Sequence, residues 1–332
     1  MKPGSGGVLV ASQAAPDLST AYARVGREIA IQLSYHRDVH LIGCHGNVAS
    51  TFTLAENDQR VPVHPYPWPY FETAHVNQLA QRINAELIIF VGDAWPFARK
   101  LVIASQEMPW ILHSPIDHAP LVEAEQILAK SCAAWAAPTE WGTSTIPDGK
   151  GFYVQHGVST ALTDAADQVG SREDACKALG WDPDIKRFLN VGGNVGDRKN
   201  LAGLIAAWHE ADIDDAELVL WCYPTRDDSN PDGMDLIGTC QQLGITNVRF
   251  PDPYQASVGY SDYDLGIVYK ASNCLMQVSK TEGFGIPIAE AQAIGIPAIV
   301  PRYAPYLEVA GVQADDPLTI PIGAWELMQL LG

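Results

Sequence analysis

The stretch Lys280-Thr-Glu-Gly-Phe-Gly-Ile-Pro-Ile-Ala-Glu290 places two glutamates eight positions apart, with a Gly-Phe-Gly turn and a proline between them. Proline is tolerated in the first turn of a helix, so Pro287 predicts the start of a helix that continues to Ile294. Gly283 and Gly285 form the loop that leads into this helix. An ordinary strand-to-helix turn with a capped helix contains the same residue types and is the structural alternative.

The charges of this stretch suit a ligand that carries both phosphate and hydroxyl groups. Backbone N–H groups at the start of a helix form a site for an anion such as a diphosphate. Glu290 falls about one turn into the helix and Glu282 lies just before it. Because carboxylates repel phosphates, both side chains should accept hydrogen bonds from hydroxyl groups. A nucleotide sugar presents this combination of groups.

Strand and helix patterns alternate along the whole chain, which favours parallel sheets covered by helices. Two such units in tandem predict an α/β protein with domains at residues 1–158 and 159–332 and a cleft between them. In open α/β sheets ligands bind beyond the carboxyl ends of the strands, which here means inside the cleft. The expected strands are 8–11, 39–43, 85–91, 109–113, 133–137, 187–191, 218–221, 247–250, 264–268 and 296–300. The expected helices are 19–33, 74–83, 171–179, 201–208, 236–243, 288–294 and 325–331.

Several segments of the chain resemble the motifs of one known protein family. Glu282-x7-Glu290, followed by Ala-Gln-Ala-Ile-Gly-Ile-Pro-Ala-Ile-Val up to Val300, is similar to the donor-site signature of retaining family-four glycosyltransferases. Residues 189–200 resemble the strand and basic loop that begin the second domain of that family, and residues 155–159 resemble its interdomain turn. Further matches to later strands of the family are residues 247–250 and 263–266. The resemblance implies the GT-B fold, in which two Rossmann-like domains face a central cleft.

The resemblance also implies an activity. A sugar would move from a nucleotide-diphosphate sugar, such as a UDP- or GDP-sugar, to the hydroxyl of a carbohydrate or other acceptor, with retention of configuration and without a further cofactor. The implied donor-binding residues are Gly192, Gly193, Arg198, Lys199, Glu282, Gly283, Phe284, Gly285 and Glu290. The rivals are a sugar-nucleotide epimerase or phosphorylase of the same fold and a non-catalytic nucleotide-sugar binding protein. A nicotinamide oxidoreductase is more distant, because residues 192–196 match its glycine fingerprint poorly.

The expected catalytic residues are Glu282, just before the helix start, and four residues at or after the ends of strands: His113, Arg198, Lys199 and Asp93. Arg198 and Lys199 should neutralise the donor diphosphate and stabilise it as a leaving group, unless they are a solvated basic pair. Relatives usually carry arginine where this chain has Gly193, so Arg198 takes over that role or the phosphate is held less firmly. By the resemblance, His113 should face the donor sugar, with a packed histidine as the structural alternative. Asp93 is expected to orient the acceptor or act as base, or else to cap a helix.

Three further features have a functional and a structural interpretation. His118 is the second choice for the role given to His113. Asp262-Tyr-Asp264 has the form of a metal motif but is expected at the start of a strand, so no metal is predicted. The segment 62–71 is rich in proline and aromatic residues, and Trp68 and Tyr70 would stack on a sugar or pack within a rigid loop.

The composition excludes nucleic acids as partners and makes membrane association weak or absent. The net charge is −18; residues 1–160 carry 10 basic and 14 acidic side chains, and residues 161–332 carry 11 and 25. The start of the chain lacks the apolar core of a signal peptide, and the six cysteines lack metal-site or redox spacing, so a cytoplasmic protein with reduced thiols is expected. About two dozen residues follow Glu308 where relatives have long helices, so the chain is truncated or domain closure is less restrained. The pattern does not indicate an oligomeric state.

Overall fold

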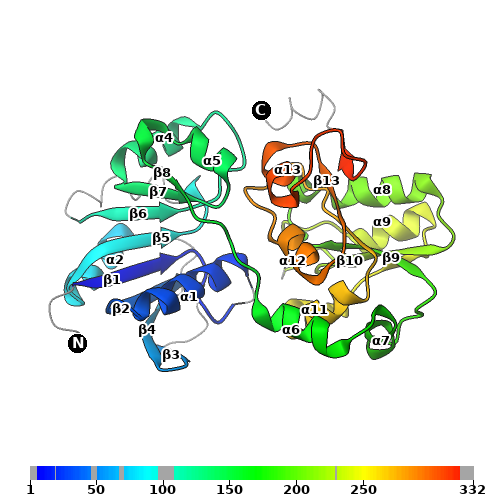
Figure 1. Ribbon diagram of the computed structural model, residues 1–332, viewed down its shortest axis with the longest axis horizontal. Helices are drawn as coiled ribbons and strands as arrows, with labels where there is room; N and C mark the ends of the chain where they lie inside the picture. Colours follow the sequence, from blue (N-terminus) through cyan, green and yellow to red (C-terminus); the bar gives the residue numbers. More distant parts are fainter. Residues whose placement is uncertain are drawn as a thin grey trace. The chain divides into compact units, whose positions relative to one another are not determined.

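The computed structural model describes residues 6–18, 20–45, 51–66, 71–95, 108–228 and 230–321. Two compact units make up the chain, Met1–His156 and Gly157–Gly332. The sequence places the boundary at nearly the same point, after residue 158. Both units contain a mostly parallel sheet with helices on its faces (Figure 1), which is the α/β architecture expected from the alternating pattern.

The first unit is built on an eight-stranded sheet with the order β3-β4-β2-β1-β5-β6-β7-β8. All neighbouring strands are parallel except the β3–β4 pair, which is antiparallel. The strands are β1 (Gly7–Ser12), β2 (Val39–Cys44), β3 (Phe52–Glu56), β4 (Gln59–Tyr66), β5 (Ala85–Val91), β6 (Trp110–His113), β7 (Ala134–Ala137) and β8 (Gly151–Tyr153). Helices include α1 (Ala21–Ser34), α2 (Thr73–Arg82), α4 (Glu123–Ser131) and α5 (Glu140–Thr145).

Side chains of β1 alternate between two hydrophobic clusters, as the two-residue period of a strand requires. Val8 and Val10 belong to the cluster that contacts α1, whereas Leu9 lies in the cluster on the other face, with α2 and α4. The Thr20 hydroxyl accepts a hydrogen bond from the Ala23 N–H, so α1 begins with a side-chain cap. The sheet is therefore buried on both faces, as expected for a parallel sheet.

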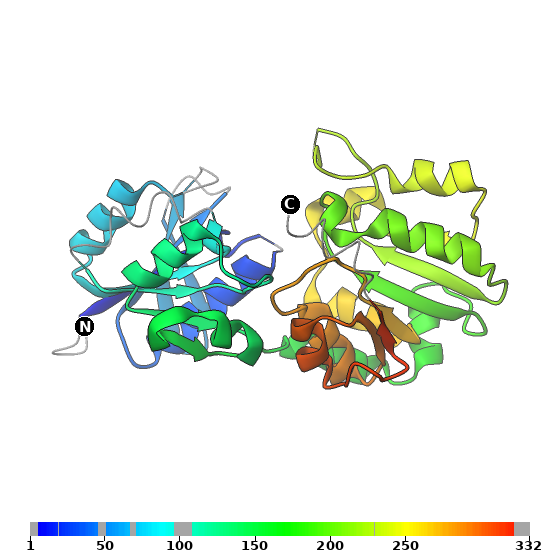
Figure 2. The ribbon, with the colours of Figure 1, turned by 90° about the horizontal axis from the view of Figure 1, so that it is seen from above.

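The second unit is built on a six-stranded parallel sheet with the order β11-β10-β9-β12-β13-β14. Figure 2 shows α8 and α9 on one face of this sheet and α12 and α13 on the other. The strands are β9 (Lys186–Val191), β10 (Ala216–Trp221), β11 (Val248–Arg249), β12 (Cys274–Met276), β13 (Ala298–Pro301) and β14 (Thr319–Ile320). The helices are α6 (Thr160–Val169), α7 (Arg172–Ala178), α8 (Leu201–Ala211), α9 (Leu236–Leu243), α10 (Pro253–Val258), α11 (Asp262–Lys270), α12 (Ile286–Ile294) and α13 (Ala304–Ala310).

One predicted strand is wrong. Residues 264–268, and the match at 263–266, lie in helix α11 instead, and the strand of this part of the sheet is β12. Ser261 caps α11, because its hydroxyl accepts from the Asp264 N–H at 3.1 Å and donates to the Asp264 carboxylate at 2.6 Å. A side chain at Gly266 would approach the Leu162 carbonyl oxygen to 2.2 Å, so this glycine lets α11 pack closely on α6.

The proline-rich segment 62–71 also differs from the expected surface loop. Its first part, up to Tyr66, belongs to β4, where Val61 and Val63 are buried at a two-residue period. This alternation outweighs the local effect of the prolines. Trp68 and Tyr70, and the helix expected at 325–331, lie outside the described residues.

Candidate functional site

The loop that leads into α12 has the conformation expected from its glycines and proline. Gly285 adopts a positive φ of 86°, and a β-carbon there would lie 2.9 Å from the Ile288 side chain, so glycine is required. Helix α12 begins at Ile286, with Pro287 in its first turn, which confirms the predicted helix start. Phe284, in the same loop, is buried.

This loop lies where the strand order of the second sheet reverses. Strands β9 and β12 are hydrogen-bonded neighbours, but the chain proceeds from β9 to β10 and β11 on one side and from β12 to β13 and β14 on the other. The loop after β9 contains the basic residues, and the loop after β12 contains Glu282. Such a switch point at the carboxyl edge is where open α/β sheets bind ligands.

The structure brings Arg198 and Lys199 to Glu282, which lies 83 positions beyond Lys199 along the chain. The Lys199 ammonium donates to the Glu282 carboxylate, and Arg198 Nη1 lies 3.3 Å from Glu282 Oε1. Backbone contacts tie the same segments together: Lys280 N–H donates to the Arg198 carbonyl at 2.8 Å, and Arg198 Nη1 donates to the Thr281 carbonyl at 3.0 Å. These three predicted residues therefore form one charged cluster.

Sequence reasoning missed two members of this charged cluster. The Lys280 ammonium forms an ion pair with Asp197. The cluster thus combines three cations (Arg198, Lys199 and Lys280) with two carboxylates (Asp197 and Glu282). Its excess of positive charge attracts an anion in a chain that is otherwise strongly acidic. The sequence signal that could have identified Lys280 is its position as a basic residue directly before the Thr-Glu-Gly-Phe-Gly loop.

The Lys199 side chain lies close to the glycine turn after β9. The Lys199 Nζ lies 3.9 Å from the position that a β-carbon of Gly192 would occupy, so Lys199 extends over this glycine. Gly193 is exposed, and a β-carbon there would meet only Val195, at 3.2 Å, among its non-adjacent neighbours within 4 Å. The buried Asn194 fixes the turn, since its amide donates to the carbonyls of Tyr223 and Met234 at 3.1 and 2.8 Å.

Glu290 lies one turn into α12, as predicted, but its side chain is only 2% exposed. The Tyr269 hydroxyl donates to the Glu290 carboxylate at 2.8 Å and holds it in the interior. A ligand hydroxyl therefore reaches Glu290 only if the adjacent loop or the carboxylate itself shifts. The sequence did not predict the role of Tyr269, which comes from α11.

A second tyrosine supports the other end of the loop. The Tyr306 hydroxyl, on α13, donates to the Ser279 carbonyl at 2.8 Å. Burial, together with the nearby Glu282 carboxylate, raises the pKa of Tyr306 well above its usual value, so the phenol stays protonated and remains a donor. Tyr306 and Tyr269 thus hold the two ends of the segment from Ser279 to Glu290.

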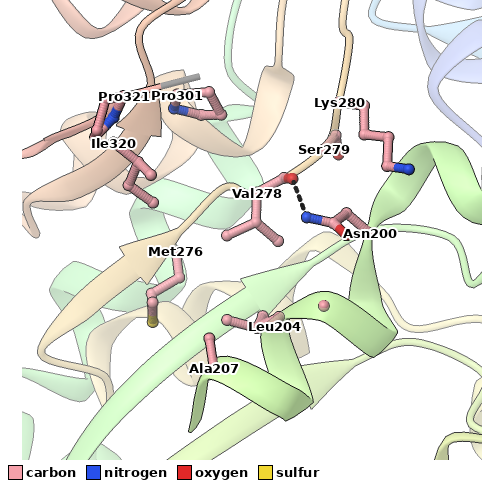
Figure 3. A pocket seen from close by; sticks show the side chains of 11 residues that line it. Asn200, Leu204, Ala207, Met276, Val278, Ser279, Lys280, Pro301, Ile320 and Pro321 are labelled. Carbon is pink, nitrogen blue, oxygen red and sulfur yellow. Dashed lines mark hydrogen bonds between the residues drawn. The ribbon is translucent and has the colours of Figure 1, made fainter. Parts of the chain in front are cut away.

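A cavity of about 220 Å³ lies beside the charged cluster, against α8 (Figure 3). Lys280 stands at its edge with its ammonium directed away from the apolar part, and the Asn200 amide donates to the Val278 carbonyl at 3.4 Å. Mainly apolar side chains line the rest of the cavity: Leu204, Ala207, Met276, Val278, Pro301, Ile320 and Pro321. This lining does not suit a diphosphate, which favours the charged cluster as the anion site.

In the first unit, His113 ends strand β6 and is 4% exposed. Its Nδ1 is buried and has no hydrogen-bond partner among the described residues. The ring of His156 lies 5.3 Å away between centroids. Burial lowers the pKa of His113 to about 4, and burial together with His113 lowers the pKa of His156 to about 3, so both imidazoles are neutral near pH 7.

Asp93 follows β5 and directly precedes the helical residues Ala94 and Trp95. The hydroxyl of Tyr22 and the amide of Gln13 donate to its two carboxylate oxygens, the latter at 3.5 Å. The Asp93 N–H donates to the Gln13 side chain at 2.6 Å. Asp93 is therefore held at the point where the order of the first sheet reverses, between β1 and β5.

His118 lies between two carboxylates in the loop that leads to α4. Its Nδ1 is 2.8 Å from Asp117, and its Nε2 is 2.8 Å from Glu125. The hydrogen bond to Asp117 and the close Glu125 carboxylate raise the pKa of His118 to about 10, so it is a cation at neutral pH. Glu125 also accepts a hydrogen bond from the Val122 N–H at the start of α4. These contacts give His118 a structural role at the helix start.

Asp262 and Asp264 lie in the first turn of α11 rather than at the start of a strand. The contacts of Asp264 with Ser261 belong to the helix cap. Within the described ranges, no cluster of three or more His, Cys, Asp or Glu side chains has a geometry suited to a metal ion. Across the same ranges, every helix is too short or too polar to cross a bilayer.

Comparisons with known proteins agree with this geometry. Residues 171–315 match the family model described as glycosyl transferases group 1. No curated protein matches the chain by sequence.

Solved structures of GT-B glycosyltransferases resemble the whole chain. A sucrose-phosphate synthase from Thermosynechococcus elongatus has a TM-score of 0.73 at 15% identity, over 98% of this chain and 90% of that one. An α,α-trehalose 6-phosphate synthase from Burkholderia multivorans has a TM-score of 0.66 at 15% identity, over 98% and 89%. The Anabaena HepE protein in complex with UDP and glucose has a TM-score of 0.59 at 15% identity, over 90% and 81%. Residues 171–315 thus resemble the glycosyl transferases group 1 family, and the chain has the GT-B fold.

Proposed function

We propose that this protein transfers a hexose from a nucleotide-diphosphate sugar to an acceptor hydroxyl, with retention of configuration. The observation that carries the proposal is the charged cluster of Arg198, Lys199 and Glu282 beside the start of α12. Two cations, a carboxylate and a glycine loop at a strand-order switch point match the phosphate and hydroxyl groups of such a donor.

The diphosphate would replace Glu282 as the partner of Arg198 and Lys199. Arg198 suits two phosphate oxygens at once, and Lys199 supplies a point charge. As the bond to the sugar breaks, negative charge grows on the leaving diphosphate, and fixed cations stabilise it. Loss of one such group typically slows a reaction about 10²–10³-fold. These cations supply the charge that a metal provides elsewhere, so we propose that transfer is metal-independent.

Glu282 then becomes available for the hydroxyl groups of the sugar, and Glu290 is assigned to the ribose. A charged hydrogen bond of this kind is worth about 1.5–3 kcal/mol. We assign His113 to the transferred sugar: as a neutral imidazole it donates or accepts a hydrogen bond without adding charge. Asp93 is assigned to the acceptor.

UDP-sugars are the first donors to test, because the similar HepE protein was solved with UDP and glucose. A carbohydrate or a sugar phosphate is the proposed acceptor class, after the names of the sucrose-phosphate and trehalose-phosphate synthases. The six cysteines are buried free thiols. This supports a reducing compartment such as the cytoplasm.

Calorimetry with UDP, GDP, UDP-glucose and GDP-mannose tests the donor site. Lys199→Ala should weaken binding of UDP or GDP, whereas Lys177→Ala, an exposed lysine of the same unit, should not. No binding of any of the four ligands, or equal binding by both variants, contradicts the proposal. Product analysis by NMR then separates the rivals: an epimerase changes the donor without acceptor, a phosphorylase requires phosphate, and a binding protein leaves the donor intact.

A further inference from the structure

The segment that follows β8 crosses the carboxyl edge of the first sheet. Strand β8 ends at Tyr153, and the Val154 N–H still donates to the Ala137 carbonyl at the end of β7, at 2.9 Å. Two residues later the chain reaches His156, whose ring lies against His113 at the end of β6. This segment therefore passes over the strand ends where ligands of such sheets bind.

His156 is also the last residue of the first unit, since Gly157 begins the second. The two imidazole rings are tilted by 45°, with centroids 5.3 Å apart. His113 is held on one side by its strand, and its buried Nδ1 has no hydrogen-bond partner among the described residues. An unpaired buried nitrogen is costly unless a ligand or water engages it, so the orientation of the His113 ring matters for function.

We infer that His156 is a positioning residue that orients the His113 ring and keeps it uncharged. This inference rests on the role proposed above for His113. Burial disfavours the charged form of His113, and the His156 ring, 5.3 Å away between centroids, contributes to that burial. Desolvation lowers both pKa values, and His113 adds to the lowering at His156. The last residue of the first unit thereby acts directly on the candidate catalytic histidine.

The first test measures the His113 ring itself. NMR titration of the histidine Cε1–H signals should show His113 with a midpoint near 4 in the wild-type protein. His156→Ala removes the ring that packs against His113 and lets water reach it, so the midpoint should rise by about one unit or more toward 6.5. His156→Phe keeps a ring in place and should give a smaller rise. An unchanged His113 midpoint and chemical shift in folded His156→Ala overturns the inference.

The second test uses release of UDP from UDP-glucose, or of GDP from GDP-mannose. His156→Ala should lower kcat about ten-fold with little change in KM, as expected when a reacting group is misplaced. The double variant with His113→Ala should be no slower than His113→Ala alone, because His156 acts through His113. His209→Ala, an exposed histidine of α8, is the matched control. Additive losses overturn the inference.

Failure of the proposed function and failure of the His156 inference give different experimental results. If calorimetry detects no nucleotide or nucleotide sugar, the proposed function fails, while the His113 titration still decides whether His156 controls the ring. If His113→Ala keeps wild-type turnover, the assigned role of His113 fails and the functional part of the inference fails with it. Thermal unfolding of each variant checks that any loss does not come from an unfolded protein.

Discussion

Replacing Glu282 by glutamine should affect the binding of the diphosphate and the binding of the sugar of a nucleotide sugar in opposite directions. In the structure the Glu282 carboxylate pairs with Lys199 and with Arg198, the latter at 3.3 Å. A diphosphate has to compete with this carboxylate for the same cations. Glu282→Gln removes the competing charge and nearly keeps the shape of the side chain. We therefore expect the variant to bind UDP more tightly and to bind or turn over UDP-glucose less well.

The magnitude follows from the exposure of the three side chains. Glu282 and Lys199 are 15% and 17% exposed and Arg198 is 44% exposed, so solvent screens both pairs in part. Two such pairs at about 0.5 kcal/mol each give about 1 kcal/mol in total. This corresponds to a Kd for UDP about five-fold lower in the variant. Raising the salt concentration from about 0.05 to about 0.5 M should reduce the gain, because salt screens partly exposed charges.

Isothermal calorimetry of UDP and UDP-glucose against both proteins measures the effect. Glu210→Gln, at an exposed position of α8, makes the same change in net charge away from the cluster and is the control. UDP binding that is unchanged or weaker in Glu282→Gln refutes the competition. A gain of equal size in Glu210→Gln shows that net charge, rather than the local pairing, is responsible.

Four further predictions concern single groups. Arg198→Ala and Lys199→Ala should each weaken UDP binding about ten-fold or more without lowering Tm, since each removes a charged hydrogen bond; wild-type affinity in both contradicts the assignment. Tyr269→Phe should lower stability by about 1–3 kcal/mol in chemical denaturation, because it leaves the buried Glu290 carboxylate without this donor; an unchanged midpoint counts against it. EDTA should leave donor turnover unchanged, and loss that manganese or magnesium restores argues for a metal. The pKa of His118 is raised in the folded protein to about 10, so its ion pairs contribute stability that is fully present below about pH 6.5 and is lost as pH rises through 10. The Tm difference between wild type and His118→Gln should therefore shrink over that pH range. A constant Tm difference excludes the linkage.

Local signals explain which parts of the site the sequence predicted. Gly285 and Pro287 determine the backbone conformation at their own positions, so a few residues sufficed to predict the loop and the start of α12. Arg198 and Lys199 follow one strand and Glu282 the neighbouring one, so the parallel-sheet topology alone brings them to one edge. The contacts of Tyr306 and Lys280 depend instead on side-chain packing between distant segments, which no local pattern encodes.

The two wrong predictions of secondary structure have different causes. The short apolar run in 264–268 fits a strand or a buried helix equally, and the cap at Ser261 was the signal that separates them. The hairpin of β3 and β4 turns at Asn57-Asp58, between the paired residues Glu56 and Gln59. Asn57 has a positive φ of 50°, which suits such two-residue turns, but the prolines that follow obscured the strand pattern.

The segment 276–280 has consequences for how this protein can evolve. Met276 and Val278 face the apolar cavity, whereas Lys280 at the other end belongs to the charged cluster (Figure 3). A change in side-chain volume at Met276 or Val278 shifts the backbone that carries Lys280, because packed interiors transmit strain. Natural drift or laboratory selection can therefore adjust the affinity of the proposed donor site through apolar substitutions, with every charged residue of the cluster unchanged.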